Sequence, residues 1–195
     1  MNTDKIIEIT RPCTQGKHYL RRYKTLREAW DHCPRGDWML WLAQKVKVGV
    51  RILTLAKGLC ANTVRQLMKD PRSVVAIDAA IAFGRGEMGK KELDVAAYAA
   101  YAAAYAADAA YAAAAYAAYA AADADDADDD ADDAAAYAAV AYAADAAAYA
   151  AAAYDADDAD DAARKGVWVK TADICREVLT EAVMQAALEA AERGE

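Results

Sequence analysis

Two runs of aspartate residues dominate the chemistry of this sequence. The first covers residues 123–133 and the second covers residues 155–161. On a helix, carboxylates three and four positions apart lie about 5–6 Å from one another, and such rows imitate the regular negative charge of a nucleic-acid backbone. We therefore expect the runs to bind a groove lined by Lys and Arg. The candidate partner-binding residues are Asp123, Asp125, Asp126, Asp128, Asp129, Asp130, Asp132, Asp133, Asp155, Asp157, Asp158, Asp160 and Asp161.

The charge is distributed unevenly along the chain. The net charge of -8 combines +10 over residues 1–91, -17 over residues 92–163 and -1 over residues 164–195. A large acidic field without basic residues costs stability through self-repulsion, so we expect a cationic partner, a basic nucleic-acid-binding protein or effector complex. The acidic region itself should not bind nucleic acid. Two alternatives remain: a solvated face that keeps the chain soluble, and pairing with the chain's own basic residues 1–91.

The segment of residues 94–163 contains only Ala, Asp and Tyr apart from two Val residues. At 100° per residue five of its tyrosines gather in one sector, where they are expected to fill a core: Tyr98, Tyr101, Tyr105, Tyr116 and Tyr119. The alanines in both runs recur in a heptad-like stripe. One helix over these 70 residues would be about 105 Å long, so the chain must fold back. The acidic runs are either solvated helical faces or the corners. The apolar stripes could pack against other helices of the same chain or against a second copy in a homodimer. One stripe consists of Ala124, Ala127, Ala131 and Ala134, and the other of Ala152, Ala156, Ala159 and Ala163.

The charge distribution and the helical patterns divide the chain into two parts. We expect a compact basic helical unit over residues 1–91 and an acidic helical region over residues 92–195. Asp37 is expected to cap a helix whose residues 38–42 are apolar and buried on several sides. A further apolar pattern at helical spacing covers residues 46–59. Asp70 and Pro71 predict the start of a helix over 73–83 that Gly84 and Gly86 end.

A last amphipathic helix is expected after Gly166, with Thr171 as its cap. Trp168 should dock the preceding connection onto the core. One side of the helix carries Ile174, Cys175, Val178, Leu179, Ala182 and Ala186. The fold class is therefore all-α, with long antiparallel Ala/Asp/Tyr-rich helices following the N-terminal unit.

Metal binding and catalysis fit the sequence less well. The aspartate runs lack the glycine and the terminal glutamate of a calcium loop. Cys13, His18, His32 and Cys33 have the residue types of a zinc site, but adjacent residues have difficulty reaching one ion, so structural roles are expected. The sequence contains no GxSxG, phosphate-binding glycine loop or HExxH. We expect a non-enzymatic protein without cofactor or metal.

The ends and the cysteines of the chain bear on its location. Residues 1–10 lack the uninterrupted apolar stretch of a signal peptide, and no run approaches the roughly 20 apolar residues of a membrane span. The four cysteines are widely spaced and form no CxxC. We therefore expect a soluble cytoplasmic protein with reduced thiols and no membrane partner.

One block of the sequence carries a resemblance to a known family. Residues 29–42, AWDHCPRGDWMLWL, follow Cys13 and Gly16 and precede the Ala/Asp/Tyr tracts. This order resembles a family of immunity proteins encoded in bacterial toxin–antitoxin-like loci and in phage or other mobile elements. The resemblance implies a bacterial or phage-encoded protein that neutralises a partner by binding it, and it supplies no binding residues.

Three hypotheses follow from these observations. The first is an inhibitor that uses its Asp-rich helical face to occupy the cationic groove of a DNA-binding defence complex, like the anti-CRISPR and anti-restriction DNA mimics. The second is an immunity protein that blocks the active site of one toxin through its N-terminal helical unit, with the acidic tract as scaffold; its binding should fail when the surface of residues 35–41 is altered. The third is a structural protein whose charge asymmetry drives head-to-tail self-association. The first is our main hypothesis because the unneutralised charge motivates it directly.

Overall fold

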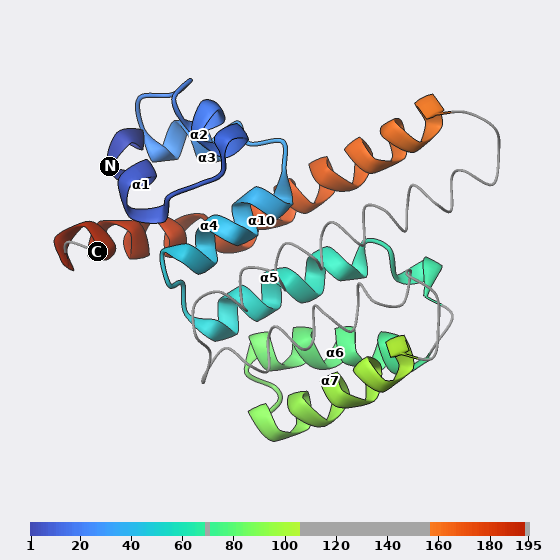
Figure 1. The fold of residues 1–195 in the computed structure, drawn as a ribbon. Helices are drawn as coiled ribbons and strands as arrows, with labels where there is room; N and C mark the ends of the chain where they lie inside the picture. The colour runs from blue at the N-terminus through green and yellow to red at the C-terminus, as the bar shows by residue number, and fades with distance from the viewer. Residues whose placement is uncertain (69–70, 106–156, 194–195) are drawn as a thin grey trace.

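Helices form the regular structure of residues 1–68, 71–105 and 157–193, which are the residues that the computed structural model describes (Figure 1). Side chains are described for residues 1–68, 71–97 and 165–193. The expected all-α fold is confirmed. In chain order the helices are α1 (Thr3–Thr10), α2 (Thr14–Leu20), α3 (Leu26–Asp31), α4 (Gly36–Lys45), α5 (Val50–Asn62), the short 3-10 helix η1 (Arg65–Leu67), α6 (Pro71–Arg85), α7 (Lys90–Tyr105) and α10 (Asp157–Arg193).

Each of the three short N-terminal helices begins at a residue whose side chain accepts a backbone hydrogen bond. Asn2 caps α1, and the thiol of Cys13 caps α2 by accepting from a backbone N–H at 3.5 Å. Thr25 and Glu28 form a capping box at the start of α3. Asn2 and Thr25 also form an isolated antiparallel bridge, which joins α1 to α3. The three helices lie together beside the C-terminal part of α10 (Figure 1).

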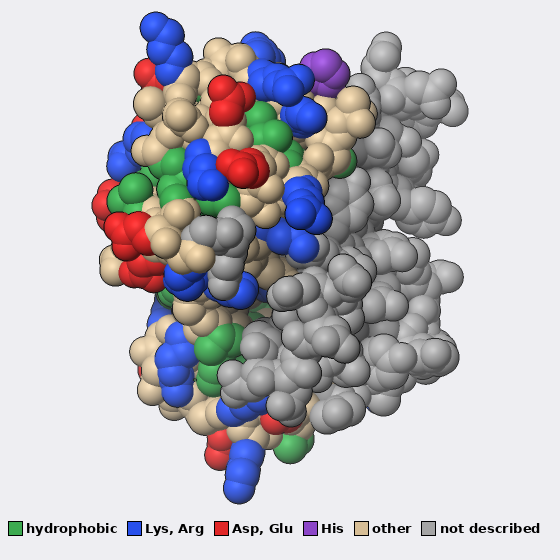
Figure 2. Space-filling view, turned by 60° about the vertical axis from the view of Figure 1, so that its left-hand side comes forward, with side chains coloured by type: hydrophobic (Ala, Val, Ile, Leu, Met, Phe, Trp, Pro, Cys, Tyr) green, Lys and Arg blue, Asp and Glu red, His purple; other side chains and the backbone are tan. Residues whose placement is uncertain are grey.

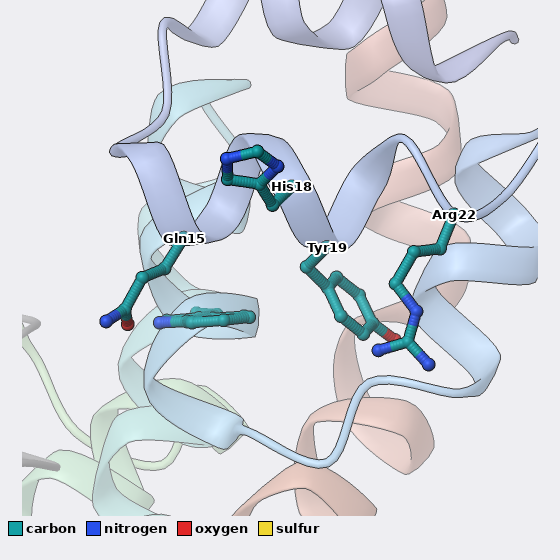
Figure 3. A pocket seen from close by; sticks show the side chains of 5 residues that line it. Gln15, His18, Tyr19 and Arg22 are labelled. Atoms are coloured by element: carbon teal, nitrogen blue, oxygen red, sulfur yellow. The ribbon is translucent and has the colours of Figure 1, made fainter.

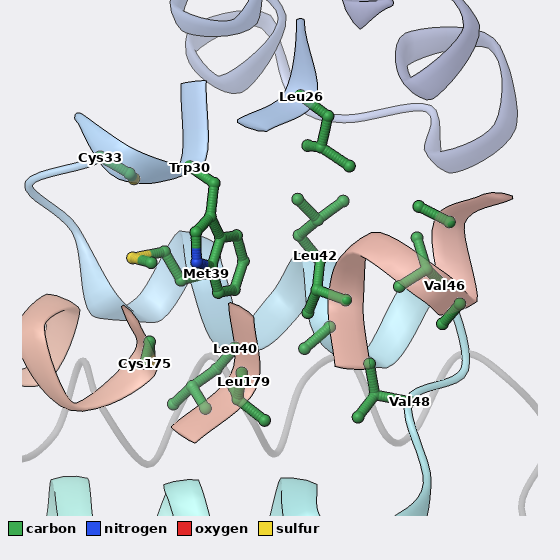
Figure 4. Close-up of a cluster of buried hydrophobic side chains, with 14 of the residues drawn as sticks. Leu26, Trp30, Cys33, Met39, Leu40, Leu42, Val46, Val48, Cys175 and Leu179 are labelled. Atoms are coloured by element: carbon green, nitrogen blue, oxygen red, sulfur yellow. The ribbon is translucent and has the colours of Figure 1, made fainter. Parts of the chain in front are cut away.

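The main core lies where α4 packs against α10 and α3. Trp30, Met39 and Leu40 are almost fully buried there with Leu179 of α10 (Figure 4). The indole Nε1 of Trp30 donates a hydrogen bond to Thr180 Oγ1 at 2.9 Å, so its polar atom is satisfied. The prediction that α4 is buried on several sides is confirmed. α10 therefore completes a core that the first 60 residues begin.

The start of α4 differs from the prediction. Arg35 is the residue that precedes the helix, and no side chain caps it. Asp37 lies inside the first turn, is 1% exposed and forms an ion pair with Arg35. Its carboxylate is bound by the guanidinium rather than by the backbone N–H groups, although a negative charge in the first turn still favours the helix dipole. The prediction that Asp37 caps α4 was wrong.

Helices α5, α6 and α7 lie side by side in a second layer (Figure 1). The predicted start of α6 at Pro71 is confirmed, and Asp70 lies outside the described residues. Gly84 lies inside α6, where its backbone packs directly on Leu55 of α5, and the helix ends at Arg85 before Gly86, whose φ is 80°. Of the two glycines, only Gly86 follows the helix.

The apolar pattern of residues 46–59 is divided between a connection and a helix. Val46 and Val48 are buried but precede α5, which begins at Val50. Leu53 is buried on α5 as expected. Lys57 is 3% exposed, and its Nζ donates a hydrogen bond at 3.3 Å to Gln44 Oε1 of α4, so this buried charged group has a polar partner.

α10 is a single helix of 37 residues, about 55 Å long. Gly166 and Thr171 lie inside it, so the prediction that a new helix begins after Gly166 with Thr171 as cap was wrong. The Thr171 hydroxyl donates to Val167 O at 2.9 Å, within the helix. Glycine costs a helix only about 1 kcal/mol relative to alanine, which is less than the stabilisation from burial of Val167 and of the apolar side chains that follow it in α10. The expected apolar side is confirmed by the buried Cys175, Leu179 and Ala186.

Several expectations fall on residues outside the described ranges. These include the first aspartate run, its alanine stripe, Tyr116, Tyr119 and the corners between long antiparallel helices. Tyr98, Tyr101 and Tyr105 lie on the helical backbone of α7. The division at residue 91 stays a prediction. Among the described helices, none combines the length and apolarity needed to cross a bilayer.

Candidate functional site

The predicted acidic residues are only partly within the described structure. The residues of the first run, and Asp155 of the second, lie outside the described ranges. Asp157, Asp158, Asp160 and Asp161 belong to the first two turns of α10. These four positions are thus helical, as expected for a helical face, and do not form a corner. The N-terminal end of α10 extends away from α1–α3 (Figure 1).

Arg35, within the block of residues 29–42, connects α4 to α10. Its guanidinium carbon lies 4.7 Å from the centroid of the Trp38 ring and 4.2 Å from that of the Trp168 ring. Its Nε donates to Asp37 Oδ1 at 3.0 Å, so the cation is bound by a carboxylate and by two indole faces. Trp168 packs on the cluster of Val64 and Val167, as a docking residue should, but it lies inside α10 and not in the connection that it was expected to dock.

Aromatic rings continue this cluster from α4 to α2 and α3. The Tyr19 and Trp38 rings meet edge to face with centroids 5.5 Å apart, and Tyr19 and Tyr23 lie 5.3 Å apart. Tyr23 stacks on His32 at 5.6 Å. The Tyr19 hydroxyl donates to Ala29 O at 2.8 Å, and burial raises the pKa of this phenol above its ordinary value. The Tyr19 ring is therefore held in place as a neutral group.

A shallow pocket of about 360 Å³ opens between α2 and α4 (Figure 3). Its walls combine two aromatic rings with an amide, an imidazole and a guanidinium. Arg22 also lies over the Tyr19 ring, with 5.9 Å between the guanidinium carbon and the ring centroid. The lining residues are Gln15, His18, Tyr19, Arg22 and Trp38.

The segment that supplies four of the five lining residues of this pocket is basic. Residues 9–27 contain six Lys or Arg residues and no Asp or Glu. Within the part of the chain whose side chains are described, only Arg27 of these six forms an ion pair, with Asp31 and Glu181. On the upper part of the face in Figure 2, several Lys and Arg side chains and a His side chain lie interspersed with Asp or Glu side chains. The other five cations are Arg11, Lys17, Arg21, Arg22 and Lys24.

The four residues with zinc-binding side chains are distributed among structural contacts. Cys13 is exposed and caps α2, and Cys33 is buried in the main core. His18 lines the pocket, whereas His32 stacks on Tyr23. Among the described residues no three His, Cys, Asp or Glu side chains come close enough to hold one metal ion.

The pocket was not predicted from the sequence, although the sequence contains a local pattern for one of its two sides. Gln15, His18, Tyr19 and Arg22 are spaced as i, i+3, i+4 and i+7, which is the spacing of one side of a helix, although α2 ends at Leu20 and Arg22 lies in the turn after it. Trp38 lies 16 residues beyond Arg22, and no local pattern indicates that it faces this stripe. Only tertiary packing brings the two together.

No protein-family model, curated protein or solved structure matches this chain. The resemblance to immunity proteins, and the function that it implies, therefore stay predictions.

Proposed function

We propose that this chain is a non-enzymatic inhibitor that uses its aspartate runs as a nucleic-acid mimic. The runs would occupy the cationic groove of a DNA-binding complex, such as the effector complex of a bacterial defence system. The single observation that carries this proposal is the charge of -17 over residues 92–163, a region with no Lys or Arg. A protein that needed only solubility could have used mixed charges, which avoid self-repulsion.

The helical backbone at the start of α10 supports the proposal. Positions 157 and 161, and positions 158 and 161, lie about one turn apart, so they rise about 6 Å and 4.5 Å along the axis. Phosphates along one DNA strand follow one another every ~3.4 Å of axis, which is a comparable scale. The same helix continues without a break into the buried Val167, and hence an acidic row on this end of α10 would be anchored to the core.

The mimic would associate quickly and would be sensitive to salt. Opposite charges steer diffusional encounter, and screening at higher ionic strength removes that advantage. A partner groove built for phosphates would supply the Lys and Arg residues that residues 92–163 lack.

Competition with duplex DNA tests this function. The full chain is titrated into basic DNA-binding effector complexes already bound to labelled duplex, at low and at moderate salt. We expect displacement of the DNA that weakens steeply as salt rises. Replacing Asp125, Asp126, Asp129 and Asp133 with Asn should abolish it while the circular dichroism of the helices is unchanged.

A matched control removes the same number of charges elsewhere. Asp4, Glu87, Glu177 and Glu192 are exposed acids outside the aspartate runs, and their replacement by Asn or Gln should leave the displacement intact. Equal loss of displacement in both variants would show that net charge alone matters. A second variant changes Asp157, Asp158, Asp160 and Asp161 to Asn. If this variant and the one with four substitutions in the first run both still displace the DNA fully, the proposal of nucleic-acid mimicry is rejected.

The alternative function is an immunity protein that binds a toxin through residues 35–41. One observation favours it, because Trp38 from this block lines the pocket whereas its neighbours Asp37, Met39 and Leu40 are buried. Such a partner would bind both Asp→Asn variants normally and would lose affinity when Trp38 is changed to Leu, which keeps an apolar side chain next to Arg35.

A further inference from the structure

The pocket between α2 and α4 has walls suited to a flat, polar aromatic group. The Tyr19 and Trp38 rings meet edge to face, so they form an angled aromatic surface. Gln15 contributes an amide that can both donate and accept hydrogen bonds, and His18 is an exposed imidazole. A nucleobase has this combination of a π face for stacking and an edge for hydrogen bonds.

The segment that forms most of the pocket carries further cations beside Arg22. Arg22 lines the pocket itself, whereas Lys17, Arg21 and Lys24 lie on α2 and on the turn that follows it without lining the pocket. Arg21, Arg22 and Lys24 are exposed. One phosphate would use one or two of these side chains, so the arrangement suits a ligand with several phosphates in succession.

We propose that this surface binds single-stranded nucleic acid. An unstacked base lies in the pocket against Tyr19 and Trp38, and the phosphates on both sides of that base are bound by Arg22 and its basic neighbours. A duplex keeps its bases stacked inside, so it cannot fill the pocket without unpairing. The favoured ligand is therefore a strand whose bases are free.

The pocket shares no residue with the aspartate runs, and the two sites can be tested separately. Loss of strand binding leaves DNA displacement by the aspartate runs unaffected, and the reverse also holds. The measurement is the fluorescence anisotropy of a labelled oligothymidylate of about 12 nucleotides, within the range that such sites cover. The full chain is titrated at about 50 mM and about 200 mM salt, beside a duplex of equal length and free thymidine monophosphate.

Replacing both Arg21 and Arg22 with Gln tests the phosphate contacts. Affinity for the single strand should fall by at least about tenfold at low salt, and the slope of log K against log salt should fall by about 1.4, since each contact with a single strand contributes about 0.7. The control changes Arg85 and Lys91, two exposed cations on α6 and α7, to Gln. This control should bind like the unmodified chain, and an equal loss in both variants would reduce the surface to non-specific charge and overturn the proposal.

Replacing Trp38 with Phe tests the stacked base. Phe keeps a ring next to Arg35 and Tyr19, so the fold is retained, while the smaller ring lowers affinity modestly. The oligonucleotide should quench the tryptophan fluorescence of the unmodified chain, and the variant should lose part of that quenching. Quenching that is unchanged in the Trp38→Phe variant would mean that no base reaches the pocket.

Other occupants of the surface give different results. Duplex binding as tight as single-strand binding, or thymidine monophosphate binding as tight as the oligonucleotide, would overturn the proposal. So would an absence of oligonucleotide binding at low salt. Salt-sensitive self-association that the Arg21→Gln and Arg22→Gln changes abolish would assign the surface instead to acidic residues of a second copy of this chain.

Discussion

Gly36 of α4 and Thr171 of α10 bring the backbones of the two helices into direct contact. A Cβ placed on Gly36 would lie 2.3 Å from Thr171 Oγ1 and 2.6 Å from the Thr171 carbonyl carbon. Two buried thiols border the contact, with Cys175 Sγ 3.7 Å from Gly36 O and Cys60 Sγ 3.8 Å from Thr171 O. The crossing of α4 and α10 therefore has no room for one added methyl group.

Changing Gly36 to Ala should destabilise the fold through this contact. The new methyl group meets backbone atoms of Thr171, which cannot rotate away as a flexible side chain can. Overpacking of this kind lowers the free energy of unfolding by about 1–3 kcal/mol, and the helices must separate for relief. Urea denaturation followed by circular dichroism measures the change.

Gly166 provides the matched control for Gly36. It lies exposed inside α10, with no atom of a neighbouring residue within 4 Å of a Cβ placed on it. Gly166→Ala should raise the free energy of unfolding by about 0.5–1 kcal/mol, because alanine favours the helix without steric conflict. Equal destabilisation by the two changes would show that steric conflict at Thr171 is not the cause.

Asp37→Ala should lower the stability more than the loss of a surface ion pair does. Asp37 is 1% exposed and accepts hydrogen bonds from Arg35, which is stacked between Trp38 and Trp168. Removing the carboxylate takes the Asp37 counter-charge and its hydrogen bond away from this largely buried guanidinium, and we expect a loss of about 2–3 kcal/mol in the free energy of unfolding. Chemical denaturation of the variant gives this value.

Asp78 supplies the comparison for Asp37. It also forms an ion pair with an arginine, Arg65, but both side chains are exposed. Arg65 holds the pKa of the Asp78 carboxyl below its usual value. Any contribution of this ion pair to the free energy of unfolding is therefore present above the ordinary pKa of an aspartate, and it is lost as pH falls through the lowered pKa of the folded state. Asp78→Ala should cost less than about 1 kcal/mol at neutral pH. Similar losses in the two variants would contradict the importance of burial at Asp37.

The elements that the sequence predicted correctly are those determined by local signals. Pro71 begins α6 because its fixed φ suits the first turn and because no backbone N–H is needed there. The apolar side of α10 follows from helical periodicity alone. Gly166 and Thr171 were misassigned because a glycine and a threonine carry only weak local preferences, which the packing of α10 on α4 and α5 outweighs.

The candidate sites divide in the same way. The charge of the aspartate runs is evident from composition, but composition does not determine how residues 106–156 fold. The α2 side of the pocket could be recognised from the spacing of Gln15 to Arg22. Its other wall could not, because Trp38 reaches the pocket only through the packing of α4 beside α2.

The four cysteines should differ sharply in reactivity. Cys13 is exposed, whereas Cys33, Cys60 and Cys175 are buried, and burial raises the pKa of the Cys33 and Cys175 thiols. A thiol-specific reagent at neutral pH should modify one cysteine of the folded chain quickly and all four in denaturant. Rapid modification of a second cysteine in the folded chain would mean that the core at the α4 and α10 crossing opens readily.

Stability should decline in alkaline solution because the buried Cys33 thiol must stay protonated. Burial raises its pKa from 9.0 to about 11, so below pH 9 the folded and unfolded states bind the same proton and the full stability is present. Between pH 9 and about 11 only the unfolded chain loses this proton, and the free energy of unfolding falls by about 1.4 kcal/mol per pH unit from this group. The raised pKa values of Tyr19 and Cys175 act in the same direction. Urea denaturation between pH 8 and 11 should therefore show a shallower decline of the free energy of unfolding for Cys33→Ala than for the unmodified chain. Cys13→Ala, the control, should match the unmodified chain. Identical pH dependence in all three proteins would assign the alkaline loss of stability to other groups.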